Sequence, residues 1–151
     1  MNRHLALDVL DTGRFMTLFY MAVDPEMACL QWVRAGHDPA VLYDPIQNTF
    51  EELTGSGIAL GVNENFRYEQ NLKTGIAEGQ VIAVGTDGIW EASNKNGEMF
   101  GKRRFRNVIS ENADKGATHI LNAVYDELDH FTRGLKSEDD ITLVVAKVEN
   151  Q

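Results

Sequence analysis

The sequence is poor in cysteine and proline, with one and three residues respectively, and it has no apolar stretch of membrane-spanning length. A single cysteine excludes an internal disulfide and a thiolate cluster for zinc. Cys29 is therefore read as a small packed hydrophobe in a reducing compartment, with a catalytic thiol as the alternative use. The N-terminus lacks the apolar core of a signal peptide, so we expect a cytoplasmic protein with no membrane partner.

Positive charge is also scarce: the sequence has 14 Lys and Arg against 23 Asp and Glu, which gives a formal net charge of −9. No nucleic-acid partner is expected, since phosphate backbones are bound by clustered Lys and Arg. The basic cluster at residues 102–106 is read as a solvated helix face, with contact to a phosphate as the alternative. At 151 residues and 43% hydrophobic content, the chain can bury one core, and we expect one domain over residues 1–151.

Strand-like segments dominate the first half of the chain. The dipeptide Asp24-Pro25 should end the first of them, because proline donates no hydrogen bond and restricts the residue before it. After the end of a helix at residues 5–10, we predict strands at residues 15–23, 28–35, 40–43, 49–53, 68–72 and 80–84, the first four forming a meander.

The second half changes to a helical period. Apolar residues recur every three or four positions over residues 118–131, which predicts a helix with one buried face. A shorter helix is predicted at residues 101–110 and a final strand at residues 141–148. Strands followed by helices indicate an α+β layered domain rather than a parallel doubly wound one.

Two acidic motifs each place a carboxylate at the tip of a predicted strand. They are Gly85-Thr86-Asp87-Gly88 and Ser137-Glu138-Asp139-Asp140-Ile141-Thr142. Oxygen ligands held by a rigid scaffold suit Mg²⁺ or Mn²⁺. Asp-Gly is also an ordinary turn dipeptide and Asp-Asp an ordinary solvated pair, so a metal site and a plain surface turn both remain open for either motif alone.

Other site templates fail. The glycine-rich residues 55–61 lack both the dinucleotide spacing and a Gly-Lys-Ser/Thr ending, and are read as a shaping loop. Residues 94–97 resemble a calcium loop without its bidentate acid, and are read as a tight turn. The four histidines show no zinc spacing, and no Gly-x-Ser-x-Gly elbow is present.

Several short motifs nevertheless occur in a particular order along nearly the whole chain. They are Phe15-Met16-Thr17-Leu18, Arg34-Ala35-Gly36-His37-Asp38-Pro39, Leu60-Gly61-Val62, Gly85-Thr86-Asp87-Gly88-Ile89-Trp90-Glu91-Ala92, Glu98-Met99-Phe100-Gly101 and Asp139-Asp140-Ile141-Thr142-Leu143-Val144-Val145. In this order the chain closely resembles the bacterial SpoIIE/RsbU-type branch of the PPM family of metal-dependent Ser/Thr protein phosphatases.

The resemblance implies an α+β fold, an α-β-β-α sandwich of two antiparallel sheets with outer helices. It also implies a binuclear Mn²⁺ or Mg²⁺ centre, whose activated water hydrolyses phosphoserine or phosphothreonine without a covalent enzyme intermediate. The implied partners are small phosphorylated regulators of bacterial signalling, of the anti-sigma-factor-antagonist type that takes part in sigma-factor regulation.

By the same resemblance, Asp87 and Asp139 would be metal ligands and the catalytic acids, with Gly88 allowing close backbone approach beside them. Asp140 is the adjacent acid and has a supporting role. His37 stands in a motif where Arg34 replaces the family's Asn, and either a structural role or a contact with substrate fits it.

The chain departs from the family at its front. Members carry an upstream Asp-x-x-Gly-His-Gly segment whose Asp bridges both metals, and nothing before Asp87 matches it. We therefore expect an N-terminally truncated domain, of which this chain is the C-terminal portion, with weak metal binding and weak or no activity on its own. The alternative is a catalytically inactive phosphatase-like module that binds a regulatory partner, and an unrelated acidic binding domain is a third reading. An unpaired sheet edge would favour a homodimer.

Overall fold

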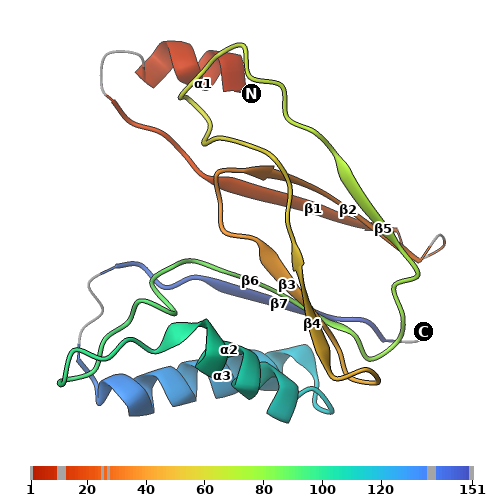
Figure 1. Cartoon of the computed structure of the whole chain (residues 1–151), viewed down its shortest axis with the longest axis vertical. Coiled ribbons are helices and arrows are strands. Elements are labelled where there is room, and N and C mark those ends of the chain that lie inside the picture. Colours follow the sequence, from red (N-terminus) through yellow and green to blue (C-terminus); the bar gives the residue numbers. More distant parts are fainter. Residues whose placement is uncertain (1, 10–12, 25, 27, 136–138, 150–151) are drawn as a thin grey trace. The chain divides into compact units, whose positions relative to one another are not determined.

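The computed structural model describes residues 2–9, 13–24, 26, 28–135 and 139–149. The chain divides into two compact units, the first made of Met1–Pro39 and Leu53–Ile76, the second of Ala40–Glu52 and Ala77–Gln151. One sheet has the strand order β1-β2-β5 and the other the order β4-β3-β6-β7 (Figure 1). The predicted α+β class, with two antiparallel sheets and helices, is confirmed.

The first unit contains a β-hairpin extended by a third strand. In this hairpin β1 pairs antiparallel with β2, with Leu18 opposite Ala35 and Asp24 opposite Cys29, as predicted for adjacent segments. Proline 25, predicted to end the first strand, lies outside the described residues. The elements of this unit are α1 (Asn2–Val9), β1 (Leu18–Asp24), β2 (Cys29–Ala35) and β5 (Asn71–Thr74).

The predicted four-strand meander is wrong at the link between its second and third strands, because β2 and β3 belong to different sheets, whereas the third and fourth strands, β3 and β4, are neighbours as predicted. The chain leaves the first sheet at Gly36, whose φ of +71° is a conformation that glycine adopts without strain. Pro39 follows, and it has no N–H to donate to a continuing ladder. The sheet of the second unit consists of β3 (Ala40–Asp44), β4 (Thr49–Leu53), β6 (Val81–Gly85) and β7 (Leu143–Lys147).

Two helices cover one face of this second sheet, α2 (Gly101–Glu111) and α3 (Ala117–Thr132) (Figure 1). The predicted helix at residues 118–131 is confirmed, and its buried positions Ile120, Val124 and Leu128 recur every four residues. They share one hydrophobic core with Phe105 and Ile109 of α2 and with the inward side chains of β3, β6 and β7. No helix in the described part of the chain is both long and apolar enough to cross a membrane.

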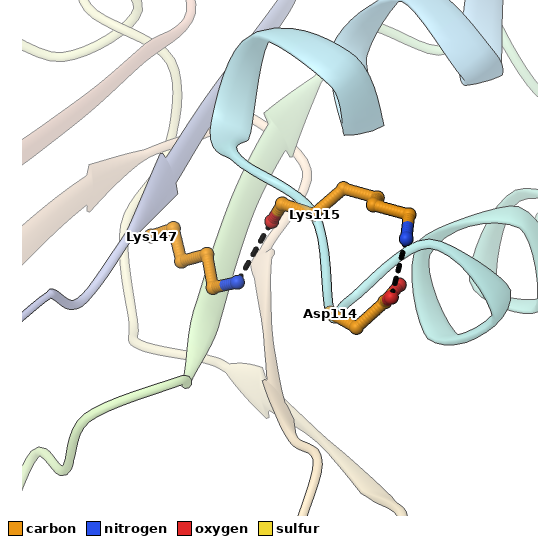
Figure 2. A network of polar contacts seen from close by, with 3 residues as sticks. All are labelled: Asp114, Lys115 and Lys147. Atoms are coloured by element: carbon orange, nitrogen blue, oxygen red, sulfur yellow. Dashed lines mark hydrogen bonds and ion pairs between the residues drawn. The ribbon is translucent and has the colours of Figure 1, made fainter.

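A polar network joins the end of β7 to the turn between α2 and α3 (Figure 2). The Lys147 Nζ donates to the backbone carbonyl of Lys115 at 2.7 Å, and the Lys115 Nζ contacts Asp114 Oδ2 at 2.7 Å. The hydrogen bond from Lys115 lowers the pKa of the Asp114 carboxyl below its ordinary value.

Replacing Lys115 with Met should raise the pKa of Asp114 towards its ordinary value. Because the shift in the native protein is downward, the stability that this pair contributes is present above the unfolded-state pKa and is lost as pH falls through the folded-state pKa. Carbon-detected NMR titration of the Asp114 carboxyl measures the change. Lys147→Met is the control, and it should move the pKa less, because Lys147 bonds a backbone carbonyl. An equal shift in both variants would contradict this account.

Candidate metal centre

The pairing of β6 with β7 brings the two acidic motifs to the same end of one sheet. These strands are antiparallel, and Gly85, the last residue of β6, lies opposite Leu143, the first residue of β7. Asp87 follows β6 closely, and Asp139 shortly precedes β7, so both carboxylates belong to this end. Residues 137 and 138 of the second motif lie outside the described residues.

Thr86 cross-links the two motifs through its hydroxyl group. The Oγ1 donates to the carbonyl oxygen of Asp140 at 2.9 Å and accepts from the N–H of Thr142 at 3.0 Å. The backbone N–H of Thr86 also donates to the carbonyl of Thr142 at 3.0 Å. Three hydrogen bonds from one residue therefore fasten the Asp87 turn to the segment that follows Asp139.

The two carboxylates are exposed and similarly arranged. Asp87 Oδ1 accepts the N–H of Gly88 at 3.1 Å, and Asp139 Oδ1 accepts the N–H of Asp140 at 2.7 Å. Each acid thus bonds the backbone of the next residue through one oxygen, which restricts its side chain. Exposed, oriented carboxylates are hard oxygen donors, so the donor chemistry fits Mn²⁺ or Mg²⁺.

Within the described residues, no group of three or more His, Cys, Asp or Glu side chains is arranged to hold a metal ion. Among the described residues, Asp87 and Asp139 are thus not joined by a third ligating side chain in an arrangement that would hold a metal ion.

Gly88 is buried directly against the Asp139 segment. A Cβ built on Gly88 would lie 2.6 Å from the carbonyl oxygen of Asp140 and 3.1 Å from its carbonyl carbon. Such an approach to a backbone atom leaves no space for a side chain at position 88. Asp140 has an exposed side chain, while its carbonyl group is enclosed between Gly88 and the Thr86 hydroxyl.

The turn that carries Asp87 is also fixed to helix α2. The N–H of Glu91 bonds the Asp87 carbonyl at 2.9 Å, and the N–H of Gly101 bonds the Trp90 carbonyl at 2.9 Å. The Lys102 Nζ lies 4.7 Å from the centre of the Trp90 ring, at cation–π distance. Lys102, the first residue of the basic cluster, thus contacts the loop after Asp87 through the Trp90 ring.

The rest of the basic cluster also makes contacts within the second unit. Arg104 Nη1 donates to the carbonyls of Met99 and Phe100 at 3.2 and 3.1 Å, and Arg106 forms an ion pair with Glu52. Arg104 and Arg106 are thus engaged by the fold itself.

His37 belongs to the first compact unit, whereas Asp87, Gly88, Asp139 and Asp140 belong to the second. Its Nδ1 lies 2.9 Å from the carbonyl oxygen of Asp38, and its ring meets Phe19 edge-on with 6.4 Å between ring centres. Arg34 binds the His37 carbonyl through Nε and the Gly55 carbonyl through Nη1 at 3.0 Å. Within its unit, the His37 turn is therefore held by hydrogen bonds to backbone carbonyls.

Solved structures show which fold this chain shares. The SiaA-PP2C domain of Pseudomonas aeruginosa matches with a TM-score of 0.83 and 20% identity, over 98% of this chain and 58% of that one. The phosphatase domain of SpoIIE from Bacillus subtilis, in a Mn-presoaked crystal, matches with a TM-score of 0.67 and 17% identity, over 99% of this chain and 74% of that one. The fold is that of PP2C-type phosphatase domains.

Sequence comparison assigns the family. The family model for stage II sporulation protein E (SpoIIE) matches residues 1–149, and the chain belongs to this family. It is 27% identical over 147 residues to the phosphoserine phosphatase RsbU of Bacillus subtilis (strain 168), covering 97% of this chain. Protein IcfG of Synechocystis sp. is 28% identical over 144 residues, covering 95% of this chain. The chain spans 43% of the length of RsbU and 22% of that of IcfG.

Sequence reasoning assigned no role to Thr86. The available signal was its position, a hydroxyl residue between the end of an apolar strand and an Asp-Gly turn, where a side chain can bond a neighbouring strand. That signal gives no partner, because Asp140 and Thr142 lie 54 and 56 positions away in the sequence.

Proposed function

We propose that residues 1–151 form the C-terminal portion of a PPM-type phosphatase domain of the SpoIIE/RsbU kind, which hydrolyses phosphoserine or phosphothreonine in bacterial signalling. The proposed substrate is a phosphorylated regulatory protein of the anti-sigma-factor-antagonist type. Membership of the SpoIIE family and the likeness to the phosphoserine phosphatase RsbU support this reaction class.

In this proposal Asp87 and Asp139 hold Mn²⁺ or Mg²⁺. When bound, such an ion lowers the pKa of a water molecule and neutralises charge on the phosphoryl oxygens. The residues of this chain supply oxygen ligands and their geometry: the backbone N–H groups of Gly88 and Asp140 orient the two carboxylates. Asp140 and His37 are assigned supporting roles.

The observation that carries the proposal is the convergence of Asp87 and Asp139 at one end of the β6/β7 pair. Two exposed acids follow one strand and precede its neighbour, and the hydrogen bonds of a single threonine join the backbone segments beside them. An ordinary surface turn needs no such link to a second acidic segment. A pair of acids held in this way suits a divalent cation that the protein shares with a phosphoryl substrate.

Metal titration tests the proposed site. We expect the chain to bind Mn²⁺ weakly and with a stoichiometry near one, because a pair of acids offers little ligand charge to offset the repulsion between two cations. Isothermal titration calorimetry gives the stoichiometry and affinity. Two tight Mn²⁺ sites would refute the prediction of a weak site, and no binding at millimolar Mn²⁺ would refute the metal centre.

Activity distinguishes the phosphatase from an inactive phosphatase-like binding module. The chain alone should release little or no phosphate from a phosphoserine protein in the presence of Mn²⁺. A longer version that carries an Asp-x-x-Gly-His-Gly segment at its N-terminus should gain Mn²⁺-dependent hydrolysis. If the longer version binds Mn²⁺ and the phosphoprotein but hydrolyses nothing, the binding module is the correct function.

A further inference from the structure

We propose that Thr86 is a positioning residue of the metal centre, whose hydroxyl group sets the distance between Asp87 and Asp139. This inference rests on the proposed function, because it concerns the same two acids. It adds a residue that neither binds the metal nor touches substrate, and it predicts how that residue acts on metal affinity.

The Thr86 hydroxyl group both donates and accepts a hydrogen bond. A threonine Oγ1 carries one donor proton and can accept through its lone pairs. In this protein the proton goes to the Asp140 carbonyl at 2.9 Å, and a lone pair receives the N–H of Thr142 at 3.0 Å. The two partners flank Ile141, so the hydroxyl bridges two backbone groups of the segment that follows Asp139.

The bonds of this side chain supplement one backbone hydrogen bond where the two motifs meet, from the Thr86 N–H to the Thr142 carbonyl at 3.0 Å. Strand pairing between β6 and β7 ends at Gly85 and Leu143. Beyond that pair, the segment of residues 139–142 has no strand conformation, and the contacts with Thr86 and Gly88 hold it. Without the hydroxyl, the Asp140 carbonyl and the Thr142 N–H would lose the shared partner that keeps them at a fixed distance from the Asp87 turn.

Both residues that this hydrogen bond joins, Thr86 and Asp140, are sequence neighbours of a candidate ligand. Asp87 follows Thr86 directly, and Asp139 precedes Asp140, whose carbonyl accepts the hydroxyl proton. We therefore expect loss of this hydrogen bond to loosen the position of one carboxylate relative to the other. Outer-shell partners that orient metal ligands typically change metal affinity by about 10–100-fold when removed.

The test compares Thr86→Val with Thr86→Ser in the isotopically labelled chain. Valine keeps the shape and loses the hydroxyl, whereas serine keeps the hydroxyl. Thr49→Val, an exposed substitution in strand β4, is the matched control for loss of a threonine hydroxyl. Paramagnetic broadening of amide signals by added Mn²⁺ gives the apparent affinity, and hydrogen exchange of the Thr142 N–H reports the cross-link without any metal.

We expect Thr86→Val to weaken Mn²⁺ binding by about tenfold or more and to accelerate exchange of the Thr142 N–H. Thr86→Ser should keep the Mn²⁺ affinity and the Thr142 N–H exchange rate close to those of the parent chain. Thr49→Val should change neither quantity. If Thr86→Val binds Mn²⁺ like the parent chain, Thr86 is not a positioning residue, although the proposed metal centre survives. If the parent chain itself binds no Mn²⁺, the proposed function fails, and the positioning role fails with it.

Discussion

Asp87→Asn and Asp139→Asn should each weaken Mn²⁺ binding by about 100-fold or more, beyond the 10–100-fold loss typical of an outer-shell substitution. Asparagine preserves the size of the side chain but removes the negative charge, and its amide group offers a divalent cation only one neutral oxygen. Either substitution removes one of the two anionic ligands that the proposed site assigns to the metal. Neither change should unfold the chain, because both side chains are exposed.

Calorimetry with Mn²⁺ measures the loss, and circular dichroism checks that each variant is folded. Asp126→Asn is the matched control, since it removes an exposed acid of the same unit from helix α3 and leaves both acidic motifs intact. Its affinity for Mn²⁺ should equal that of the parent chain. If all three variants bind Mn²⁺ alike, the ion is attracted by the net negative charge of the chain and the assigned ligands are wrong.

Much of the second unit could be predicted from local sequence pattern. The spacing of apolar residues in α3 identified a helix with one buried face, because burial every four residues is a property of helical geometry alone. Strand β4 was predicted with the bounds Thr49–Leu53 that it has. The final strand was predicted to begin at residue 141 and begins at Leu143; the N–H of Thr142 is bound by the Thr86 hydroxyl group rather than by a backbone carbonyl, although the Thr142 carbonyl still accepts the Thr86 N–H.

Sheet membership was the part of the fold that local pattern could not give. Segments β2 and β3 both look like strands, yet they belong to different sheets, and Gly36 between them has a positive φ. A pattern with a period of two residues indicates a strand and one buried face, but it carries no information on the partner strand. The order β4-β3-β6-β7 joins strands far apart in sequence, so it depends on the whole fold.

The acids of the candidate site could likewise be predicted from the sequence, whereas their arrangement could not. Residue type and motif context led to the prediction of Asp87 and Asp139 as metal ligands, because hard cations prefer oxygen ligands and the resemblance to the family implies these two positions. The placement of both acids at one end of the sheet, however, depends on the pairing of Gly85 with Leu143, and the segments that carry them are linked through Thr86. The two solved PP2C structures compared above are 20% and 17% identical to this chain, so they support the fold. The proposed chemistry is argued from Asp87, Asp139 and Thr86.

Gly88→Ala should be the most disruptive single-methyl change at this end of the sheet. Its Cβ would lie 2.6 Å from the Asp140 carbonyl oxygen, a backbone atom that the Thr86 hydroxyl already holds in place. Relief of the overlap requires the Asp139 segment to move away from the Asp87 turn. We expect a loss of about 1–3 kcal/mol in the free energy of unfolding, as for other overpacked sites, together with loss of measurable Mn²⁺ binding.

Two alanine substitutions at other glycines separate a local clash from a general effect of added bulk. At Gly85 the new Cβ would meet the Ile89 Cδ1 at 2.7 Å, and the end of a side chain can move aside at smaller cost than backbone. At Gly116 no heavy atom lies within 4 Å, so that variant should keep the stability and metal affinity of the parent. Urea unfolding and Mn²⁺ calorimetry should therefore rank the losses as Gly88→Ala, then Gly85→Ala, then Gly116→Ala. Parent-like Mn²⁺ affinity in Gly88→Ala would show that the approach of the Asp140 carbonyl does not govern the geometry of the two acids.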